Sequence, residues 1–147
     1  MSLSRPIACL LVLVLLPLSA VAQDNAQDNP IVQRMQSFVQ AYNAGDAAAI
    51  GAFYTEDGAL FPPQSPAMVG RDEIAAYYAR AFQGGAGNLR LSFLEIRQLG
   101  PEFVIEIGET MVSVEEQEIH GRYLHIWTLV DGEWFLRRDM FHVLEVK

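Results

Sequence analysis

Cysteine, histidine and basic residues are scarce in this sequence of 147 residues. The only cysteine, Cys9, lies in the apolar N-terminal segment, so the remainder of the chain has no intrachain disulfide and must be held together by packing. Ten Lys and Arg against eighteen Asp and Glu give a formal net charge of −8, which argues against nucleic acid as a partner. The three histidines lack the close spacing of metal ligands, and the sequence has no glycine-rich phosphate loop and no nucleophile elbow. We therefore expect neither a metal nor a cofactor.

The N-terminal segment has the pattern of a secretory signal peptide. The stretch Ile7–Leu18 is almost wholly apolar, and Ala20-Val21-Ala22 is a small-residue cleavage site. About twelve apolar residues are too few to span a bilayer. The sequence thus predicts a signal peptide over residues 1–22, a disordered polar leader over 23–29, and a periplasmic or secreted protein that is not membrane-bound after cleavage. The alternatives are a membrane anchor and, as a lesser one, a lipoprotein, although Cys9 stands at the start of the apolar run and a lipid-attachment cysteine would follow that run.

Residues 30–147 predict one α+β domain in which three helices precede four long strands. Asn29-Pro30 begins the first helix, Asp46 caps a shorter helix over 47–53, and a third helix runs from Gly70 to about Gln83. A turn at 54–58 and a short extended piece at 59–61 lie between the second and third helices. Alternating apolar residues predict strands over 89–99, 103–114, 121–130 and 133–146. We expect a curved antiparallel sheet of four to six strands with the helices in its concavity, forming a cone with one open end.

Asp131-Gly132 predicts a tight hairpin between the last two strands. Alternation places His125 on one face of the first strand, among aromatic residues, and places Arg137 and Asp139 together on one face of the second. A two-residue turn pairs Val130 with Glu133, and this register puts His125 on the Arg138 face. A one-residue bulge would instead bring His125 to the face of Arg137 and Asp139.

Four local patterns in this domain resemble the nuclear transport factor 2-like superfamily, which includes ketosteroid isomerases and SnoaL-like polyketide cyclases. They are the helix end Asn43–Asp46, the turn Phe53–Asp57, the helix start Gly70–Ile74 and the hairpin Asp131–Trp134. The resemblance covers residues 30–147 and implies a cone-shaped fold with an internal pocket. It does not define an activity, because the superfamily contains isomerases, dehydratases, cyclases and non-catalytic binding proteins.

Comparison with ketosteroid isomerases implies that this chain is not one of them. Phe38 stands where those enzymes have a tyrosine donor, and Pro62-Pro63 stands where they have an aspartate base before a proline. His125 matches their second donor, a neutral aspartic acid. The base and one donor are thus absent, while the cavity that they line is expected to remain. The resemblance also favours the register that brings His125 to Arg137 and Asp139.

The candidate catalytic residues are His125 as general acid or base, Asp139 as its orienting carboxylate and Arg137 as an oxyanion stabiliser. The alternative is an internal Arg137–Asp139 ion pair that His125 merely contacts, because a buried charge needs a partner whether or not it is catalytic. The candidate ligand-binding residues are aromatic, and core packing is the commoner role for such residues: Phe38, Tyr42, Phe61, Tyr123, Trp127 and Phe141.

These residues predict a pocket for a small, largely apolar organic molecule. The matching reactions are isomerisation, dehydration or cyclisation of a carbonyl compound, and a non-catalytic binding or protein-interaction module is the alternative. We also expect a homodimer, because the outer sheet face would expose an apolar patch in a monomer. We expect that patch to contain Leu124, Ile126, Trp134, Leu136 and Met140.

Overall fold

The computed structural model describes residues 28–147, so the predicted signal peptide and most of the predicted leader lie outside the described residues. The helices are α1 (Pro30–Asn43), α2 (Ala47–Ala52) and α3 (Arg71–Gln83). The strands are β1 (Tyr54–Phe61), β2 (Met68–Val69), β3 (Ala86–Gly100), β4 (Phe103–Val114), β5 (Gln117–Val130) and β6 (Glu133–Val146). The predicted α+β class is confirmed. No helix within this part of the chain is long and apolar enough to cross a membrane.

The six strands form one sheet in the order β2-β1-β6-β5-β4-β3. All neighbours are antiparallel except β1 and β6, which are parallel, so the sheet is mixed and not wholly antiparallel as expected. The predicted turn at 54–58 is also wrong, since these residues begin β1. Gly58 lies where that strand shifts its register, and an added Cβ there would approach the Thr55 carbonyl oxygen to 2.9 Å. The missing side chain thus lets the strand bulge and continue.

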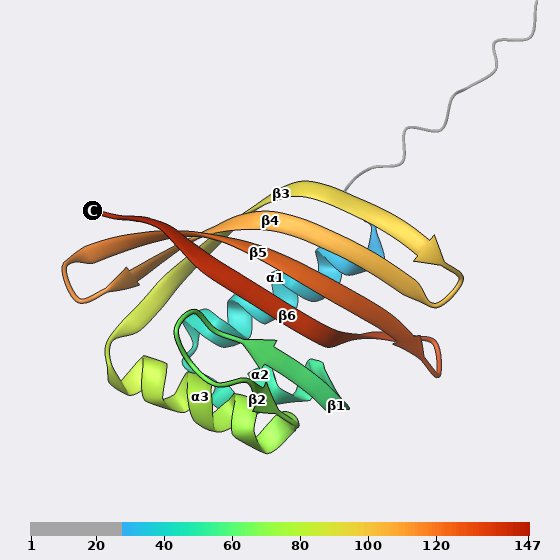
Figure 1. Ribbon diagram of the computed structural model, residues 1–147, viewed down its shortest axis with the longest axis horizontal. Coiled ribbons are helices and arrows are strands. Elements are labelled where there is room, and N and C mark those ends of the chain that lie inside the picture. The colour runs from blue at the N-terminus through green and yellow to red at the C-terminus, as the bar shows by residue number, and fades with distance from the viewer. Residues whose placement is uncertain (1–27) are drawn as a thin grey trace, which may run out of the picture.

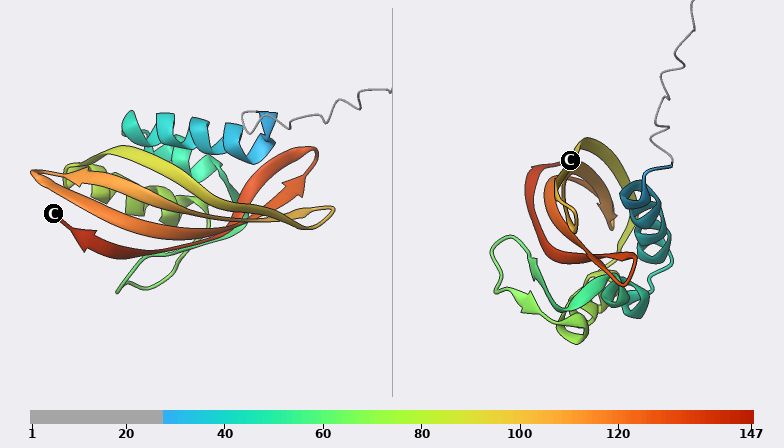
Figure 2. Two further views of the ribbon diagram at one scale, coloured as in Figure 1. Left: turned by 90° about the horizontal axis from the view of Figure 1, so that it is seen from above. Right: turned by 90° about the vertical axis from the view of Figure 1, so that its right-hand side faces the viewer.

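The long strands β3 to β6 curl strongly, and the helices lie on the concave side of the sheet (Figure 1). The end-on view in Figure 2 shows α1 along the open side of the curl and α3 beneath it. The core lies between these layers and contains Met35 and Phe38 of α1, Ile74 of α3, and Trp127 and Leu136 of the sheet. The expected cone of helices and curved sheet is therefore present.

Local signals account for the helix ends. The Asn29 side chain accepts a hydrogen bond from the Ile31 amide at 2.9 Å, and Asp46 accepts one from the Ala49 amide at 2.9 Å. Asn43, at the end of α1, bonds to both the amide and the carbonyl of Leu89, at 2.7 and 3.1 Å. Leu89 lies where β3 shifts register against β4, so Asn43 supplies the partner that the sheet does not and joins α1 to β3.

A one-residue bulge at Arg137 decides the register of the β5–β6 hairpin. Val130 pairs with Glu133 across the predicted two-residue turn, and this register continues to the pair Trp127–Leu136. The next pair is Ile126–Arg138, so Arg137 is the extra residue. From there to Val143, the β6 side chains change face relative to β5, until a second shift between Gly121 and His120.

This bulge corrects the predicted outer face. Leu136 precedes it and is fully buried, while Trp134 is half-buried against the core. Both were expected to be exposed. Met140 and Leu124 do face outward, with exposed fractions of 55% and 37%.

Candidate functional site

Three ionisable side chains lie in one row across the concave face of the sheet. Glu106 of β4 pairs with His125 of β5, which pairs with Asp139 of β6. Their exposed fractions are only 0%, 4% and 3%. Directly opposed residues on neighbouring strands have adjacent side chains, so the register itself assembles this row.

Glu106 accepts three hydrogen bonds. The donors are the Tyr123 hydroxyl at 2.8 Å, the Trp127 Nε1 at 2.6 Å and the His125 Nδ1 at 3.1 Å. Because the side chain of Glu106 is fully buried, these three donors replace the water that would otherwise hydrate it. Glu106 is thus the innermost carboxylate of the row.

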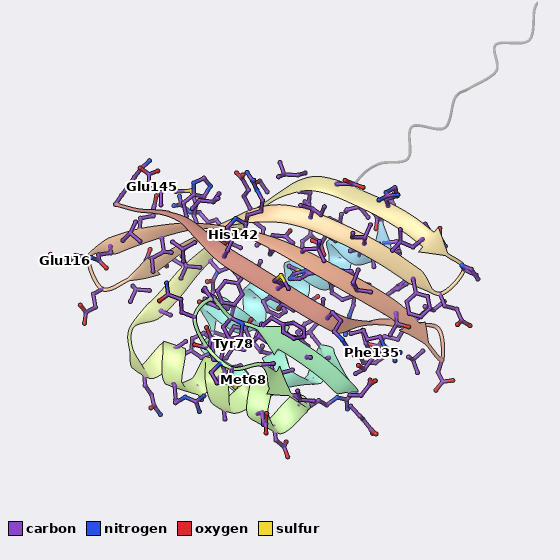
Figure 3. All side chains as sticks on the ribbon, viewed as in Figure 1. Met68, Tyr78, Glu116, Phe135, His142 and Glu145 are labelled. Atoms are coloured by element: carbon purple, nitrogen blue, oxygen red, sulfur yellow. The ribbon has the colours of Figure 1, made fainter. Side chains whose placement is uncertain are left out.

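Asp139 lies at the other end of the row and binds both His125 and a tyrosine. Its Oδ1 is 3.3 Å from the His125 Nε2, and its Oδ2 accepts a hydrogen bond from the Tyr54 hydroxyl at 2.6 Å. Tyr54 is also hydrogen-bonded to Tyr78 of α3, whose side chain points toward the sheet (Figure 3). A continuous chain of polar groups therefore runs from α3 through Asp139 and His125 to Glu106.

The charges of the row hold a proton on His125. Burial by itself lowers the pKa of His125, but the nearby carboxylates of Asp139 and Glu106 outweigh it and raise that pKa to about 10. Burial, and then the negative charge of Asp139, raise the pKa of both Tyr54 and Tyr78. At neutral pH, His125 is therefore an imidazolium that donates from both ring nitrogens, and the two tyrosines are neutral.

Gly108 makes room for this arrangement. A Cβ added there would collide with the hydroxyl of Tyr123 and would come within 2.5 Å of the Ser92 carbonyl oxygen. Because Gly108 has no side chain, the Tyr123 ring lies across β4 and its hydroxyl reaches Glu106.

A mainly apolar cavity of about 310 Å³ adjoins the row and is partly open to solvent. It extends toward the end of the sheet that carries the β4–β5 turn and the C-terminus (Figure 1). Its polar lining residues are His125, Asp139, Thr110, Tyr123 and His142 from the sheet and Tyr42, Tyr77 and Tyr78 from the helices. Its volume is at the small end of the range of about 300–1,000 Å³ for ligand pockets.

Six of the nine predicted site residues line this cavity: Phe38, Tyr42, Tyr123, His125, Asp139 and Phe141. Phe61 is half-buried at the end of β1 and does not line it. Trp127 does not line it either, because it is fully buried and serves as a donor to Glu106.

Arg137 lies apart from His125 and Asp139. As the bulged residue, it extends away from the row, and its Nη2 is 3.3 Å from the Asp57 Oδ2 on the surface. It lines a second, more polar cleft with Phe135, which lies toward the β5–β6 turn in Figure 3. The expected cluster of Arg137, Asp139 and His125 is therefore reduced to Asp139 and His125. The alternative of an internal Arg137–Asp139 ion pair is wrong, because Arg137 pairs with Asp57.

Sequence reasoning missed the importance of Glu106. The available signal was a single carboxylate in the apolar stretch Phe103–Ile107, on the face shared by Val104 and Gly108. A charge at a position that alternation assigns to the core requires a buried partner.

Within residues 28–147, no group of three or more His, Cys, Asp or Glu side chains has the arrangement of a metal site.

The fold is shared with several solved structures of low sequence identity. A ketosteroid isomerase-like protein from Erwinia carotovora atroseptica SCRI1043 superposes with a TM-score of 0.70 at 23% identity, over 82% of this chain and 98% of that chain. An NTF-2 like protein of unknown function from Shewanella oneidensis MR-1 gives 0.69 at 22% identity, over 76% and 95%. A hexachlorocyclohexane dehydrochlorinase gives 0.68 at 11% identity, over 83% and 88%. Comparison with curated proteins gives no match.

The sequence also matches a family profile. The SnoaL-like domain profile covers residues 35–136, from the middle of α1 to the β5–β6 hairpin, which is more than half of the chain. The matched span includes Glu106 and His125 and ends three residues before Asp139. The chain belongs to the family of SnoaL-like domains, with the cone-shaped fold of nuclear transport factor 2-like and ketosteroid isomerase-like proteins.

Proposed function

We propose that this domain binds a small, largely apolar organic molecule in the cavity and carries out acid/base chemistry on it at Asp139. The observation that carries the proposal is a buried carboxylate–imidazolium pair in the wall of an otherwise apolar cavity of about 310 Å³. Apolar pockets with a few convergent polar groups are typical of ligand sites. Similar folds in a ketosteroid isomerase-like protein and a dehydrochlorinase support a small organic ligand.

Asp139 is a better proton acceptor than His125 in this arrangement. With a pKa of about 10, His125 keeps its proton at neutral pH and cannot accept another. Its Nε2 instead contacts Asp139 and orients that carboxylate. Asp139 would take a proton from the ligand, become a neutral carboxylic acid, and return the same proton to another position of the ligand or to water, while His125 keeps its own proton throughout. Proton abstraction, as required for isomerisation, dehydration or cyclisation of a carbonyl compound, is the matching chemistry. Arg137 has no part in the proposal because its guanidinium pairs with Asp57 outside the cavity.

Non-catalytic binding of the same molecule is the second candidate. It is favoured by how completely the row is satisfied, since both ring nitrogens of His125 and both oxygens of Asp139 already have partners. In that case, the row would only stabilise the fold and orient the ligand.

Mass spectrometry of small molecules retained by the purified protein tests the proposal. An organic molecule recovered from wild-type protein is then offered as substrate to wild type, to Asp139→Asn and to the surface control Glu109→Gln. Turnover by wild type and control, with loss of turnover but retained binding in Asp139→Asn, supports catalysis. Retained binding with no turnover by wild type supports the binding protein, and equal retention and turnover by all three proteins contradicts the site.

We also propose that the domain dimerises through the outer face of the sheet. Leu124 lies between Ile107 and Met140 in the strand register, and both Leu124 and Met140 are exposed. Contiguous apolar side chains on a sheet face are typical of interaction surfaces. Sedimentation equilibrium at tens of micromolar should give a dimer for wild type and a monomer for Met140→Asp, and a monomeric wild type would contradict this.

Export with cleavage after Ala22 is a further proposal, resting on the apolar segment and cleavage site described above. The intact mass of the exported protein should correspond to a chain beginning at Gln23. A mature species that retains residues 1–22 would contradict it.

A further inference from the structure

The wall of the cavity carries a net negative charge. Glu106 receives three donors, and His125 lies between the two carboxylates and donates to both. Two carboxylates and one imidazolium leave one uncompensated negative charge. Asp139 is the anion that lines the cavity, whereas Glu106 does not.

Within residues 28–147, no side chain with a permanent positive charge lines this wall, since the lining residues include no lysine or arginine. His142 lies at the rim and is exposed to solvent. Burial raises the pKa of Tyr77, and the positive charge of Arg80 on the exposed side of α3 partly opposes this rise. Arg80 itself does not line the cavity. An anionic ligand would therefore lose its hydration without gaining a buried cation.

Asp139 retains capacity for a further hydrogen bond. A carboxylate offers about four acceptor positions, and within the protein Asp139 uses one on each oxygen, for His125 and Tyr54. The proton-donating nitrogens of His125 are both occupied by carboxylates. The wall thus presents acceptor capacity to a ligand, and its donors are the hydroxyls of the tyrosines and Thr110 and the exposed His142 at the rim.

From this geometry, we infer that the cavity selects neutral or cationic ligands with a hydroxyl or amine donor and rejects carboxylates of the same shape. The inference rests on the proposed function, since it names the class of molecule that the cavity takes. The donor would bind Asp139 while the apolar body of the ligand fills the space between α1, α3 and the sheet. Discrimination comes mainly from repulsion of the wrong charge, which is how many specific sites exclude close analogues.

Four naphthalene probes of similar size separate the effect of a hydrogen-bond donor from the effect of ligand charge at pH 7. They are 2-naphthol, 2-naphthylmethylamine, 2-methylnaphthalene and 2-naphthoate. Isothermal titration calorimetry on wild-type protein should show 2-naphthol and the amine binding at least about ten-fold more tightly than 2-naphthoate. Both should also bind more tightly than 2-methylnaphthalene, which has the same body but no donor.

Two variants that each remove one carboxylate charge identify the source of the discrimination. Asp139→Asn removes the charge from the cavity wall, and the preference for 2-naphthol over 2-naphthoate should fall to near unity. Glu109→Gln removes the same formal charge from β4 at an exposed ion pair with Arg122, and the preference should stay as in wild type. If Asp139→Asn does not fold, the four probes on wild type and Glu109→Gln still show whether the cavity prefers 2-naphthol to 2-naphthoate.

Each outcome has a distinct meaning. Binding of 2-naphthoate as tight as that of 2-naphthol would overturn the charge selectivity and leave the proposed pocket intact. Equal binding of 2-naphthol and 2-methylnaphthalene would overturn the role of Asp139 as acceptor. Failure of all four probes to bind would overturn the inference together with the proposed pocket.

Discussion

Replacing Glu106 by glutamine tests how far the buried row determines the stability of the domain. Glu106 is fully buried and accepts hydrogen bonds from Tyr123, His125 and Trp127. A glutamine has nearly the same shape, but its amide nitrogen can only donate, so of the three partners only the Tyr123 hydroxyl, which can also accept, can pair with that nitrogen. The imidazolium of His125 also loses one of its two carboxylates.

The expected cost follows from the burial of this charge cluster. Removing one partner of a buried ion pair costs about 3–5 kcal/mol, and here the cost comes from the lost pair with His125 and from the weaker hydrogen bonds of the remaining donors, since Asp139 still faces the imidazolium. With a denaturant slope of about 2 kcal/mol per M, Glu106→Gln should lower the midpoint of urea unfolding by about 2 M. The pKa of His125 should also fall, because the Asp139 carboxylate alone opposes the desolvation of the ring.

Urea unfolding monitored by tryptophan fluorescence measures the first effect, and NMR titration of the imidazole nitrogens measures the second. Glu109→Gln is the matched control on the same strand, since Glu109 is partly exposed and pairs with Arg122 and His120 on the surface. Its unfolding midpoint and the His125 titration should remain those of wild type. A Glu106→Gln protein with wild-type stability and an unchanged His125 pKa would refute the reasoning.

Three further predictions follow from particular contacts. The pKa of His125 is about 10 in the folded protein and 6.5 in the unfolded chain, so its contribution to the free energy of unfolding is fully present below pH 6.5 and is lost as the pH rises toward 10. Urea midpoints should reveal a loss of up to about 5 kcal/mol over this window. A midpoint that stays flat would contradict the imidazolium. Gly108→Ala should destabilise the domain by about 1–3 kcal/mol because its Cβ meets Tyr123, whereas Gly100→Ala, with open space around it, should be nearly neutral in thermal unfolding. Arg137→Gln should leave the affinity of any cavity ligand unchanged in calorimetric titration, since Arg137 does not line the cavity, and a large loss of affinity would restore its predicted role.

Much of the fold could be predicted because its signals are local. Asn29 and Asp46 cap α1 and α2 through their own side chains, and Asp131-Gly132 turns the chain with positive φ at both residues. Alternation along β5 correctly placed Tyr123, His125 and Trp127 on the inner face, since a strand reverses its side chains at every residue. The same local patterns carried the family resemblance that the domain profile later established.

The candidate site depended on features that no local pattern contains. The parallel pairing of β1 with β6 brings Tyr54 to Asp139, although these residues are far apart in the sequence. The bulge at Arg137 decided whether His125 would face Arg138 or Asp139, and two readings of the hairpin were open without it.

The sequence by itself determined the three helices, the long strands, the β5–β6 turn and the presence of His125 and Asp139 near the pocket. Only the tertiary structure decided that Glu106 completes their row, that Arg137 leaves it and that Leu136 enters the core. The physical reason is that helix caps and turns are satisfied within a few residues, whereas strand register is a property of pairs of strands. A shift of one residue reverses every side chain that follows it, so a single bulge separates one possible site from another.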